Sequence, residues 1–356
     1  MAAAGPIPKM MKAAVVEEFG KPLTIKQVPV PEPGYGQVLV KVITSGVCHT
    51  DLHVRDGDWH VKPKIPIIPG HEGAGVVVKL GEGVQTLKVG DRVGHAWLHD
   101  SCGNCDYCLG GWETVCGSQH QTGFAADGCF AEYTVCEANY VGKIPDSVSF
   151  AQASPLLCAG VTTYKALKET EAKPGQWVAI IGACGGLGHV GVQYAKAMGL
   201  KVCAIDFGAE KKSYALEKLG AEAYVDIKDK KGEEIVAEVK KVCGGMGPHG
   251  ALILAPSPDA FRQGVDMLRP MGFAVGIALP PADFPVDIFS LILHRKTIRG
   301  SIVGTRKDMN ECLQIAGDGK VTCTVEERKL EEINEIFDDM SKGKIKGRCV
   351  LRFAPY

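Results

Sequence analysis

The stretch Gly182-Ala183-Cys184-Gly185-Gly186-Leu187-Gly188 directly follows the apolar run Trp177–Ile181 and opens a helical pattern over residues 189–198. Glycines in a strand-to-helix turn let the backbone approach a bound phosphate, and the helix N-terminus offers free N–H groups and the positive end of its dipole. The pattern therefore favours a site for a dinucleotide pyrophosphate. Its spacing, G-x-x-G-G-x-G, is one residue longer than the usual fingerprint, so by itself it leaves an ordinary tight turn open.

Asp206 strengthens the dinucleotide interpretation. It ends the next predicted strand, residues 201–205, and follows the glycines by about twenty residues, the position from which a carboxylate reaches the adenosine ribose. A carboxylate there accepts hydrogen bonds from ribose hydroxyls and repels a 2′-phosphate, which favours NAD over NADP. The alternative is a solvated acid at a strand end. The residues predicted here to bind the cofactor are Gly182, Gly185, Gly186, Leu187, Gly188 and Asp206.

The sequence pattern changes along the chain. Strand and helix patterns alternate from residue 177 to 275, which predicts a parallel, doubly wound α/β sheet. Earlier in the chain, short strand-like runs stand between Gly and Pro clusters and predict mostly β structure. A chain of 356 residues is long for a single hydrophobic core, so two domains are expected. The other predicted elements are strands at 39–42, 75–78, 131–135 and 348–353 and helices at 210–219 and 330–340.

Composition excludes several classes of partner. The formal net charge is -1, so no summed positive field exists to hold a nucleic acid or an anionic membrane. No apolar run approaches the roughly 20 residues that cross a bilayer, and residues 1–12 lack the apolar stretch of a secretory signal. We therefore expect a cytoplasmic protein. In reducing surroundings its 14 cysteines point to metal ligation, catalysis or plain packing.

Cys102, Cys105, Cys108 and Cys116 form the pattern C-x₂-C-x₂-C-x₇-C in a polar loop. Four thiolates from one short loop can close a tetrahedral shell, which is typical of a structural zinc site. An iron–sulfur cluster is the main competitor, but the bacterial run places its fourth cysteine after three residues and before a proline. Here Gly117 follows Cys116. Unligated packing of all four thiols is the remaining alternative.

A second set of metal ligands is dispersed. Cys48, His71 and Cys158 would make a Cys₂His set, and three protein ligands leave the fourth zinc position open, as in catalytic sites. Spacing alone does not single these three residues out. Each taken alone is more often a buried thiol or a satisfied histidine than a ligand.

Four motifs together carry a resemblance. They are Gly46-Val47-Cys48-His49-Thr50-Asp51-Leu52-His53, Gly70-His71-Glu72-Gly73-Ala74-Gly75, the four-cysteine loop and Leu157-Cys158-Ala159-Gly160. They are similar to the zinc-dependent alcohol dehydrogenases of the medium-chain dehydrogenase/reductase superfamily, the tetrameric microbial type above all. The resemblance extends over residues 12–353. It implies a mostly-β, GroES-like catalytic domain from both chain ends, residues 1–157 and 295–356, with a Rossmann NAD-binding domain, residues 158–294, inserted between them.

The resemblance also implies roles for individual residues. Cys48, His71 and Cys158 would bind the catalytic zinc, Asp51 would support His71, and Glu72 would lie behind the metal. Thr50 would accept the substrate proton and His53 would release it to solvent. His49 and Arg348 correspond to pyrophosphate contacts, and Lys211 would lie beside the adenosine ribose. The residues that match substrate-pocket positions, for which core packing is the alternative, are Trp59, Trp97, Leu279 and Ile302.

The implied reaction is the reversible oxidation of small primary alcohols to aldehydes with hydride transfer to NAD, in a homo-oligomer, most simply a tetramer, that holds two zinc ions per subunit. Three alternatives stay open. The chain could be a polyol or aromatic-alcohol dehydrogenase of the same superfamily, although two indoles argue for a small pocket. It could be a zinc-free quinone or enoyl reductase, although those relatives lack this ligand set. A non-enzymatic protein that binds zinc and nucleotide is the third.

Overall fold

The computed structural model describes residues 6–353, which divide into two compact units. The parallel-sheet unit contains Ala159–Gly304 and Gly319–Thr322. The mixed-sheet unit contains Met1–Cys158, Thr305–Asp318 and Cys323–Tyr356. Within the described residues, no helix combines the length and apolarity that a membrane span requires.

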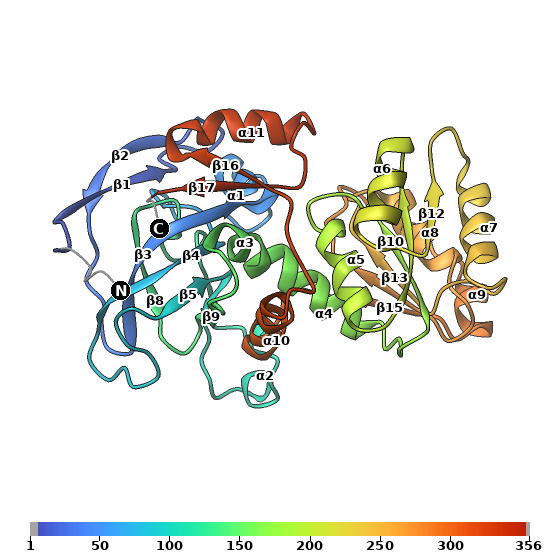
Figure 1. The fold of residues 1–356 in the computed structure, drawn as a ribbon, viewed down its shortest axis with the longest axis horizontal. Helices are drawn as coiled ribbons and strands as arrows, with labels where there is room; N and C mark the ends of the chain where they lie inside the picture. Colours follow the sequence, from blue (N-terminus) through green and yellow to red (C-terminus); the bar gives the residue numbers. More distant parts are fainter. Residues whose placement is uncertain (1–5, 354–356) are drawn as a thin grey trace. The chain divides into compact units, whose positions relative to one another are not determined.

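The parallel-sheet unit is built on six parallel strands in the order β12-β11-β10-β13-β14-β15 (Figure 1). The order reverses between β10 and β13, so the carboxyl end of β10 lies at the topological switch point, where doubly wound sheets bind their ligands. The strands are β10 (Trp177–Ile181), β11 (Lys201–Asp206), β12 (Ala223–Asp226), β13 (Gly250–Ile253), β14 (Phe273–Gly276) and β15 (Thr297–Gly300).

Helices cover both faces of this sheet, which explains its continuous apolar strands. Helices α4 and α5 contact each other, as do α7 and α8, and Figure 1 shows α5 and α7 on opposite sides of the sheet. Residues 178–181 of β10 are all buried, as the apolar run predicts. The helices are α4 (Val161–Glu169), α5 (Gly188–Ala197), α6 (Ala209–Ser213), α7 (Gly232–Val242), α8 (Pro258–Asp266) and α9 (Ile288–Leu293).

The observed structure of this unit differs from two expectations based on the sequence. The unit continues past residue 294, the expected boundary, because Thr297 of β15 pairs with Phe273 of β14. This edge strand is short and alternates between half-buried and exposed residues, so it carries no apolar run. The single helix expected at 210–219 is also divided, because α6 changes into a π-helix, η3 (Tyr214–Lys218).

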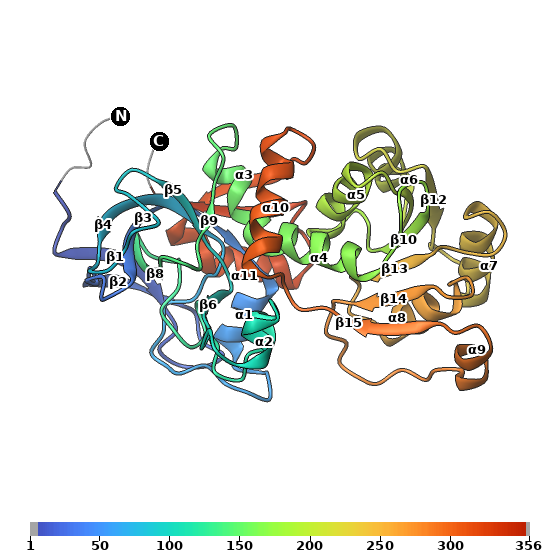
Figure 2. The ribbon, with the colours of Figure 1, turned by 90° about the horizontal axis from the view of Figure 1, so that it is seen from below.

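The mixed-sheet unit is organised around β3, whose neighbours are β4, β17 and β8 (Figure 2). The strand expected at 131–135 begins two residues later, as β8. The strands of the large sheet are β3 (Gln37–Val47), β4 (Gly73–Leu80), β5 (Arg92–His95), β8 (Tyr133–Glu137), β9 (Gly142–Lys143), β16 (Val325–Lys329) and β17 (Arg348–Arg352). Two small sheets pair β1 (Met10–Val15) with β2 (Thr24–Pro29) and β6 (Leu98–Asp100) with β7 (His120–Gln121).

Short helices join these strands and close the core. Ile333, Ile336 and Phe337 on one side of α11 are fully buried and pack into a cluster with residues of β1 and β3. The helix expected at 330–340 is present as a 3₁₀ turn, η4 (Leu330–Glu332), followed by α11. The remaining helices are α1 (His49–Asp56), α2 (Asp106–Leu109), η1 (Glu113–Val115), α3 (Phe150–Pro155), η2 (Leu156–Gly160), α10 (Arg306–Gly317) and α11 (Ile333–Ser341).

Candidate active site

Cys48, His71, Glu72 and Cys158 converge in the mixed-sheet unit, with one potential ligand atom of each within 4.8 Å of the others. Cys48 caps α1 directly after β3. His71 and Glu72 precede β4, which pairs with β3. Cys158 lies in η2, a π-helical turn of the kind that recurs at functional sites. The sheet and the two helices thus bring together four residues that are far apart in sequence.

Asp51 holds the imidazole of His71 in one orientation. Its Oδ1 atom lies 2.9 Å from His71 Nδ1 and accepts a hydrogen bond from the backbone N–H of Gly70 at 3.1 Å. Its Oδ2 atom accepts the backbone N–H of Cys48 at 2.9 Å. Because Nδ1 faces a carboxylate, Nε2 is the nitrogen of His71 that is left for a metal, the arrangement that zinc-binding histidines use.

Glu72 and Arg348 form a buried ion pair behind these ligands. The carboxylate is fully buried, and desolvation raises the pKa of Glu72 to about 7 against the opposing charge of Arg348. Its Oε2 atom has no hydrogen-bond partner among the described residues, so one buried oxygen is left for a ligand such as a metal ion. Gly46 is required here, because a Cβ atom at that position would lie 1.9 Å from Glu72 Oε2.

The two thiols of the site differ in acidity. A hydrogen bond with the Cys158 thiol, followed by the neighbouring His71, holds the pKa of Cys48 well below its ordinary value. The same hydrogen bond, together with burial, raises the pKa of Cys158. Burial lowers the pKa of His71, but the Asp51 carboxylate outweighs burial and the pKa lies well above its ordinary value. The Cys48 thiolate therefore supplies negative charge, and a divalent cation would replace the protons that His71 and Cys158 hold.

Aromatic rings flank His71. Trp97 lies edge-on to it with a centroid separation of 5.3 Å, and Trp59 lies 6.4 Å from Trp97. Phe124 contacts both indoles at 5.9 Å. The two tryptophans were predicted from the sequence to line the substrate pocket, whereas Phe124 was not, because no motif surrounds it. Its proximity to the site arises from the loop that follows β7.

Thr50 and His53 both lie on α1, the helix that the relay argument requires. His53 Nδ1 lies 3.0 Å from both carboxylate oxygens of Asp58, and the imidazole stacks on Trp59 with a centroid separation of 5.4 Å. The His53 side chain is 36% exposed, whereas Asp51 on the same helix is 1% exposed. The helix thus connects the buried ligands to solvent.

The four-cysteine loop forms a second cluster in the same unit. The ligand sulfur atoms of Cys102, Cys105, Cys108 and Cys116 all lie within 4.8 Å of one another. The Sγ atoms of Cys102 and Cys108 lie 3.9 Å apart, and those of Cys116 and Cys102 lie 3.6 Å apart. Two sulfurs on one tetrahedral zinc lie about 3.8 Å apart, because each Zn–S bond is about 2.3 Å. These thiols are free, and the geometry fits zinc rather than disulfides.

Local backbone groups prepare this loop for an ion. N–H groups of Asn104 and Cys105 point at the Cys102 sulfur and lower the pKa of Cys102 to about 6. A backbone hydrogen bond from Cys108 lowers the pKa of Cys105, but burial and the neighbouring thiols outweigh it and raise that pKa to about 11. Removal of a thiol proton from Cys102 is therefore easy, whereas Cys105 keeps its proton until a cation replaces it.

The glycine stretch occupies the carboxyl end of β10 and leads into α5, as the sequence predicts. Gly182 has a φ of +85°, which favours glycine. A Cβ atom on Gly188 would lie 2.1 Å from the carbonyl oxygen of Gly182, so the helix can begin this close to the strand only with glycine. The turn thus leaves the N-terminal N–H groups of α5 at the switch point of the sheet.

Asp206 links this turn to α6. Its Oδ2 atom accepts the backbone N–H of Cys184 at 2.9 Å, and its Oδ1 atom accepts the N–H of Phe207 at 2.9 Å and Lys211 Nζ at 2.7 Å. Lys211 also lies 3.7 Å over the Phe207 ring. Three of the roughly four acceptor positions of the carboxylate are used, so one is left for a ribose hydroxyl.

The other predicted residues fall in different places. His49 is exposed at the start of α1, and Arg348 is buried against Glu72. Leu279 and Ile302 belong to the parallel-sheet unit and are 70% and 50% exposed, unlike the half-buried tryptophans. Their roles at the cofactor and in the substrate pocket stay predictions.

Comparisons with known proteins identify the family. The family described as "Alcohol dehydrogenase GroES-like domain" matches residues 34–146, and the one described as "Zinc-binding dehydrogenase" matches residues 186–317. An alcohol dehydrogenase of Geobacillus stearothermophilus is 54% identical over 342 residues, 96% of this chain and 99% of that protein. This chain belongs to the zinc-type alcohol dehydrogenases of the medium-chain superfamily. The GroES-like and Rossmann-type architecture expected from the sequence is confirmed.

Solved structures extend this result. The alcohol dehydrogenase of the archaeon Aeropyrum pernix superimposes with a TM-score of 0.86 at 34% identity, covering 96% of this chain and all of that one. Acetophenone reductase from Geotrichum candidum, solved with NAD, gives a TM-score of 0.83 at 29% identity, covering 98% and 99% of the two chains. Zinc-type alcohol dehydrogenases are the standard example of a Cys₂His catalytic zinc, and this chain brings such a set together.

Proposed function

We propose that this alcohol dehydrogenase oxidises small primary alcohols reversibly to aldehydes, with NAD as hydride acceptor and two zinc ions per subunit. The observation that carries the proposal is the Cys48, His71 and Cys158 cluster, in which Asp51 fixes the tautomer of the histidine. Such an open three-ligand set differs from the closed four-cysteine set in leaving room for a substrate. One ion would therefore be catalytic and the other structural.

When bound, the catalytic zinc supplies Lewis acidity to the substrate hydroxyl, and NAD supplies the acceptor for the hydride. The chain contributes position and proton transfer. Asp51 keeps His71 in its ligand orientation, and Arg348 neutralises Glu72 behind it. Oxidation converts an alcohol and NAD⁺ to an aldehyde, NADH and one proton, so the proton must leave the buried site.

Thr50 and His53 support a route for that proton. They lie three residues apart on α1, and residues at this spacing share a helix face. We infer that the Thr50 hydroxyl accepts the substrate proton and that His53 releases it to solvent. Asp58 at 3.0 Å holds the imidazole and balances its transient positive charge.

The aromatic residues beside His71 support a small substrate. Trp59, Trp97 and Phe124 contact one another at centroid separations of 5.9 to 6.4 Å and occupy space that a larger alcohol would need. The ethanol-like range is therefore favoured over polyols and aromatic alcohols. Asp206, with one acceptor position left and Cys184 and Lys211 fixing its carboxylate, supports NAD over NADP.

Exposed apolar residues support assembly into a homo-oligomer, with a tetramer as the proposed state in the cytoplasm. Helix α9 leaves Ile288, Phe289, Ile292 and Leu293 58 to 72% exposed. The strand β15 forms an edge of the parallel sheet, with backbone groups that can pair with another strand. Clustered apolar exposure of this kind marks an association surface.

Initial rates with NAD and alcohols of increasing chain length test the proposal. We expect turnover with ethanol and propanol, a decrease for branched and aromatic alcohols, and loss of activity in Cys48→Ser. The Trp59→Ala variant should accept larger alcohols. Comparable rates for benzyl alcohol and ethanol in the unmodified enzyme would contradict the small-substrate assignment, and activity without zinc would contradict the reaction itself.

A further inference from the structure

A third group of ligand-type side chains lies outside both zinc sites. One potential ligand atom each from His99, Asp100 and Glu137 lies within 4.8 Å of the others. His99 and Asp100 belong to β6, and Glu137 ends β8, which contacts β6. None of the three takes part in the proposed reaction.

Each of the three side chains is held through one atom and leaves another free. His99 Nδ1 lies 3.1 Å from His95 Nε2. Asp100 Oδ1 lies 2.7 Å from His120 Nδ1. Glu137 Oε1 accepts a hydrogen bond from Gln37 Nε2 at 2.7 Å. Each side chain thus keeps one imidazole nitrogen or carboxylate oxygen that could bind a metal ion, and the partners His95, His120 and Gln37 would act as the outer groups that orient these ligands.

The imidazole of His99 is the anchor of this group. His99 is 8% exposed, and its Nε2 atom has no hydrogen-bond partner among the described residues, nor does it form an ion pair with Asp100 or Glu137. Potential ligand atoms of His99, Asp100 and Glu137 lie within 4.8 Å of one another without forming an ion pair, so an ion could bridge the three side chains.

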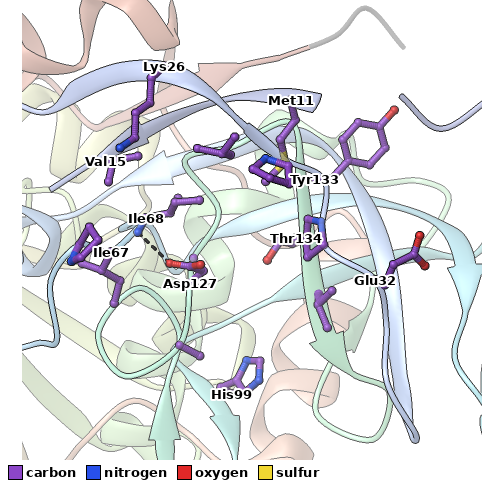
Figure 3. Close-up of a pocket in the computed structure, with 17 residues that line it drawn as sticks. Met11, Val15, Lys26, Glu32, Ile67, Ile68, His99, Asp127, Tyr133 and Thr134 are labelled. Atoms are coloured by element: carbon purple, nitrogen blue, oxygen red, sulfur yellow. Dashed lines mark hydrogen bonds between the residues drawn. The ribbon is translucent and has the colours of Figure 1, made fainter. Parts of the chain in front are cut away.

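The hydrogen bonds of His95 agree with the tautomer that an ion needs. Its Nδ1 atom faces Thr134 Oγ1 at 3.3 Å and the Cys129 sulfur at 3.6 Å. His95 Nε2 also lies 3.0 Å from Thr122 Oγ1. With the proton of His95 on Nδ1, its Nε2 can accept hydrogen bonds from the Thr122 hydroxyl and from the Nδ1–H of His99, which leaves the Nε2 lone pair of His99 free. His99 also lines a pocket of about 460 Å³ (Figure 3), whose lining does not include Asp100 or Glu137.

We propose that His99, Asp100 and Glu137 form a third metal site that takes a first-row divalent cation, zinc above all. The donor set of one imidazole and two carboxylates suits zinc and its neighbours better than Mg²⁺ or Ca²⁺, which prefer oxygen alone. The site contains no thiolate and keeps exposed edges, since the Asp100 side chain is 30% exposed. It therefore binds zinc more weakly than the cysteine sites do.

An ion there would fasten the base of the four-cysteine loop. That loop leaves the sheet after β6 and returns to it at β7, and the ion would join β6 to β8 of the main sheet. The ion would also restrain β7, because His120 on that strand contacts Asp100. Binding of an ion to this third site should then raise the thermal stability of the enzyme without altering its turnover.

Cobalt titration of the zinc-loaded enzyme tests the proposal. Co²⁺ bound by nitrogen and oxygen gives weak visible bands, whereas thiolate ligation adds an intense near-ultraviolet charge-transfer band. We expect one further equivalent of Co²⁺ per chain without the charge-transfer band, and competition by Zn²⁺ but not by Mg²⁺. A thiolate spectrum, or no binding of a further equivalent, would overturn the site.

Variants locate the ion. Glu137→Gln should lower the affinity for the further Co²⁺ ion at least tenfold. His120→Asn should lower this affinity less, because His120 only positions Asp100. Glu18→Gln removes an exposed carboxylate of the same unit away from the cluster and is the matched control. The zinc content after gel filtration and the ethanol rate should be unchanged in all three. Equal affinity in Glu137→Gln and Glu18→Gln would contradict the assignment.

Discussion

His71 Nδ1 lies 2.9 Å from Asp51 Oδ1, and the two side chains are 2% and 1% exposed. A carboxylate in this position fixes the ring orientation and raises the basicity of the other nitrogen, so it strengthens a metal ligand without touching the metal. The same carboxylate also caps α1 through the backbone N–H of Cys48. One side chain therefore orients two of the three proposed zinc ligands.

Asp51→Asn should lower the affinity of the catalytic site for zinc about tenfold to a hundredfold, the usual effect of losing such a partner. The amide keeps one acceptor oxygen, so α1 remains capped. Chelator competition measures the affinity for zinc, with Asp58→Asn as the control because the Asp58 carboxylate contacts the exposed His53. Equal zinc affinity in both variants would show that Asp51 stabilises the fold without supporting the zinc ligands.

Cys105→Ser should lower the thermal midpoint and disturb assembly more than it lowers turnover at 25 °C, since the structural zinc holds one loop. Calorimetry and initial rates on the same preparation measure the two effects. Cys136→Ser is a control, because Cys136 is a buried thiol outside the loop. Loss of turnover with an unchanged midpoint would contradict a structural role.

Removal of zinc from the loop should expose one reactive thiol first. With a pKa of about 6, Cys102 is largely thiolate at pH 7, whereas Cys105 with a pKa of about 11 stays protonated. Because the pKa of Cys102 is lowered, its alkylation should rise through pH 6 and level off by pH 8. Peptide mapping after iodoacetamide treatment measures the order in which the cysteines are alkylated. Equal labelling of both cysteines at pH 7 in the chelated protein would contradict it.

Asp206→Gly should weaken the use of NAD and narrow its advantage over NADP. The carboxylate that repels a 2′-phosphate is lost, and Lys211 is released from its 2.7 Å ion pair to meet that phosphate. A hydrogen bond to a charged group contributes about 1.5–3 kcal/mol, so kcat/KM for NAD should fall about tenfold to a hundredfold. Asp229→Asn, at an exposed turn of the same unit, is the control. An unchanged ratio of kcat/KM for NAD to kcat/KM for NADP would show that Asp206 does not contact the ribose.

His53→Gln should slow alcohol oxidation most at low pH and steepen its dependence on pH, because proton release then needs hydroxide or a slower water path. Loss of an acid–base group commonly costs tenfold to ten-thousandfold in rate. Zinc content should not change, since His53 binds no metal in the proposed scheme. His60→Gln, nearby but outside α1, is the matched control. Coincident pH–rate profiles for His53→Gln and the unmodified enzyme would show that the proton leaves by another route.

The central strands of the parallel sheet were predictable from the sequence because they are buried on both faces. Residues 177–181 are continuously apolar, and the observed strand has the same bounds. The edge strand β15 was not predictable by the same criterion, since its residues alternate between half-buried and exposed. The π-helical turn after α6 was also not predictable, because the spacing of apolar residues does not distinguish it from an α-helix. Burial, rather than strand propensity, decided which strands the sequence revealed.

The site was predictable where ligands are close in sequence and not where packing assembles them. The spacing from Cys102 to Cys116 predicts one cluster, and their sulfurs do gather. Cys48, His71 and Cys158 came from resemblance, because only the pairing of β3 with β4 and the position of η2 bring them together. Phe124 and the His99 group were missed for the same reason. No local pattern records contacts between β6, β7 and β8.

Metal analysis combined with the ethanol rate tests the central claim most directly. The enzyme is gel-filtered in zinc-free buffer, analysed for zinc, and assayed with ethanol and NAD, and the His71→Ala variant is treated alike. We predict two zinc ions per chain and NAD reduction for the unmodified enzyme, and one zinc ion per chain without NAD reduction for His71→Ala. Two retained zinc ions in His71→Ala, or ethanol-dependent NAD reduction by that one-zinc variant, would contradict the account.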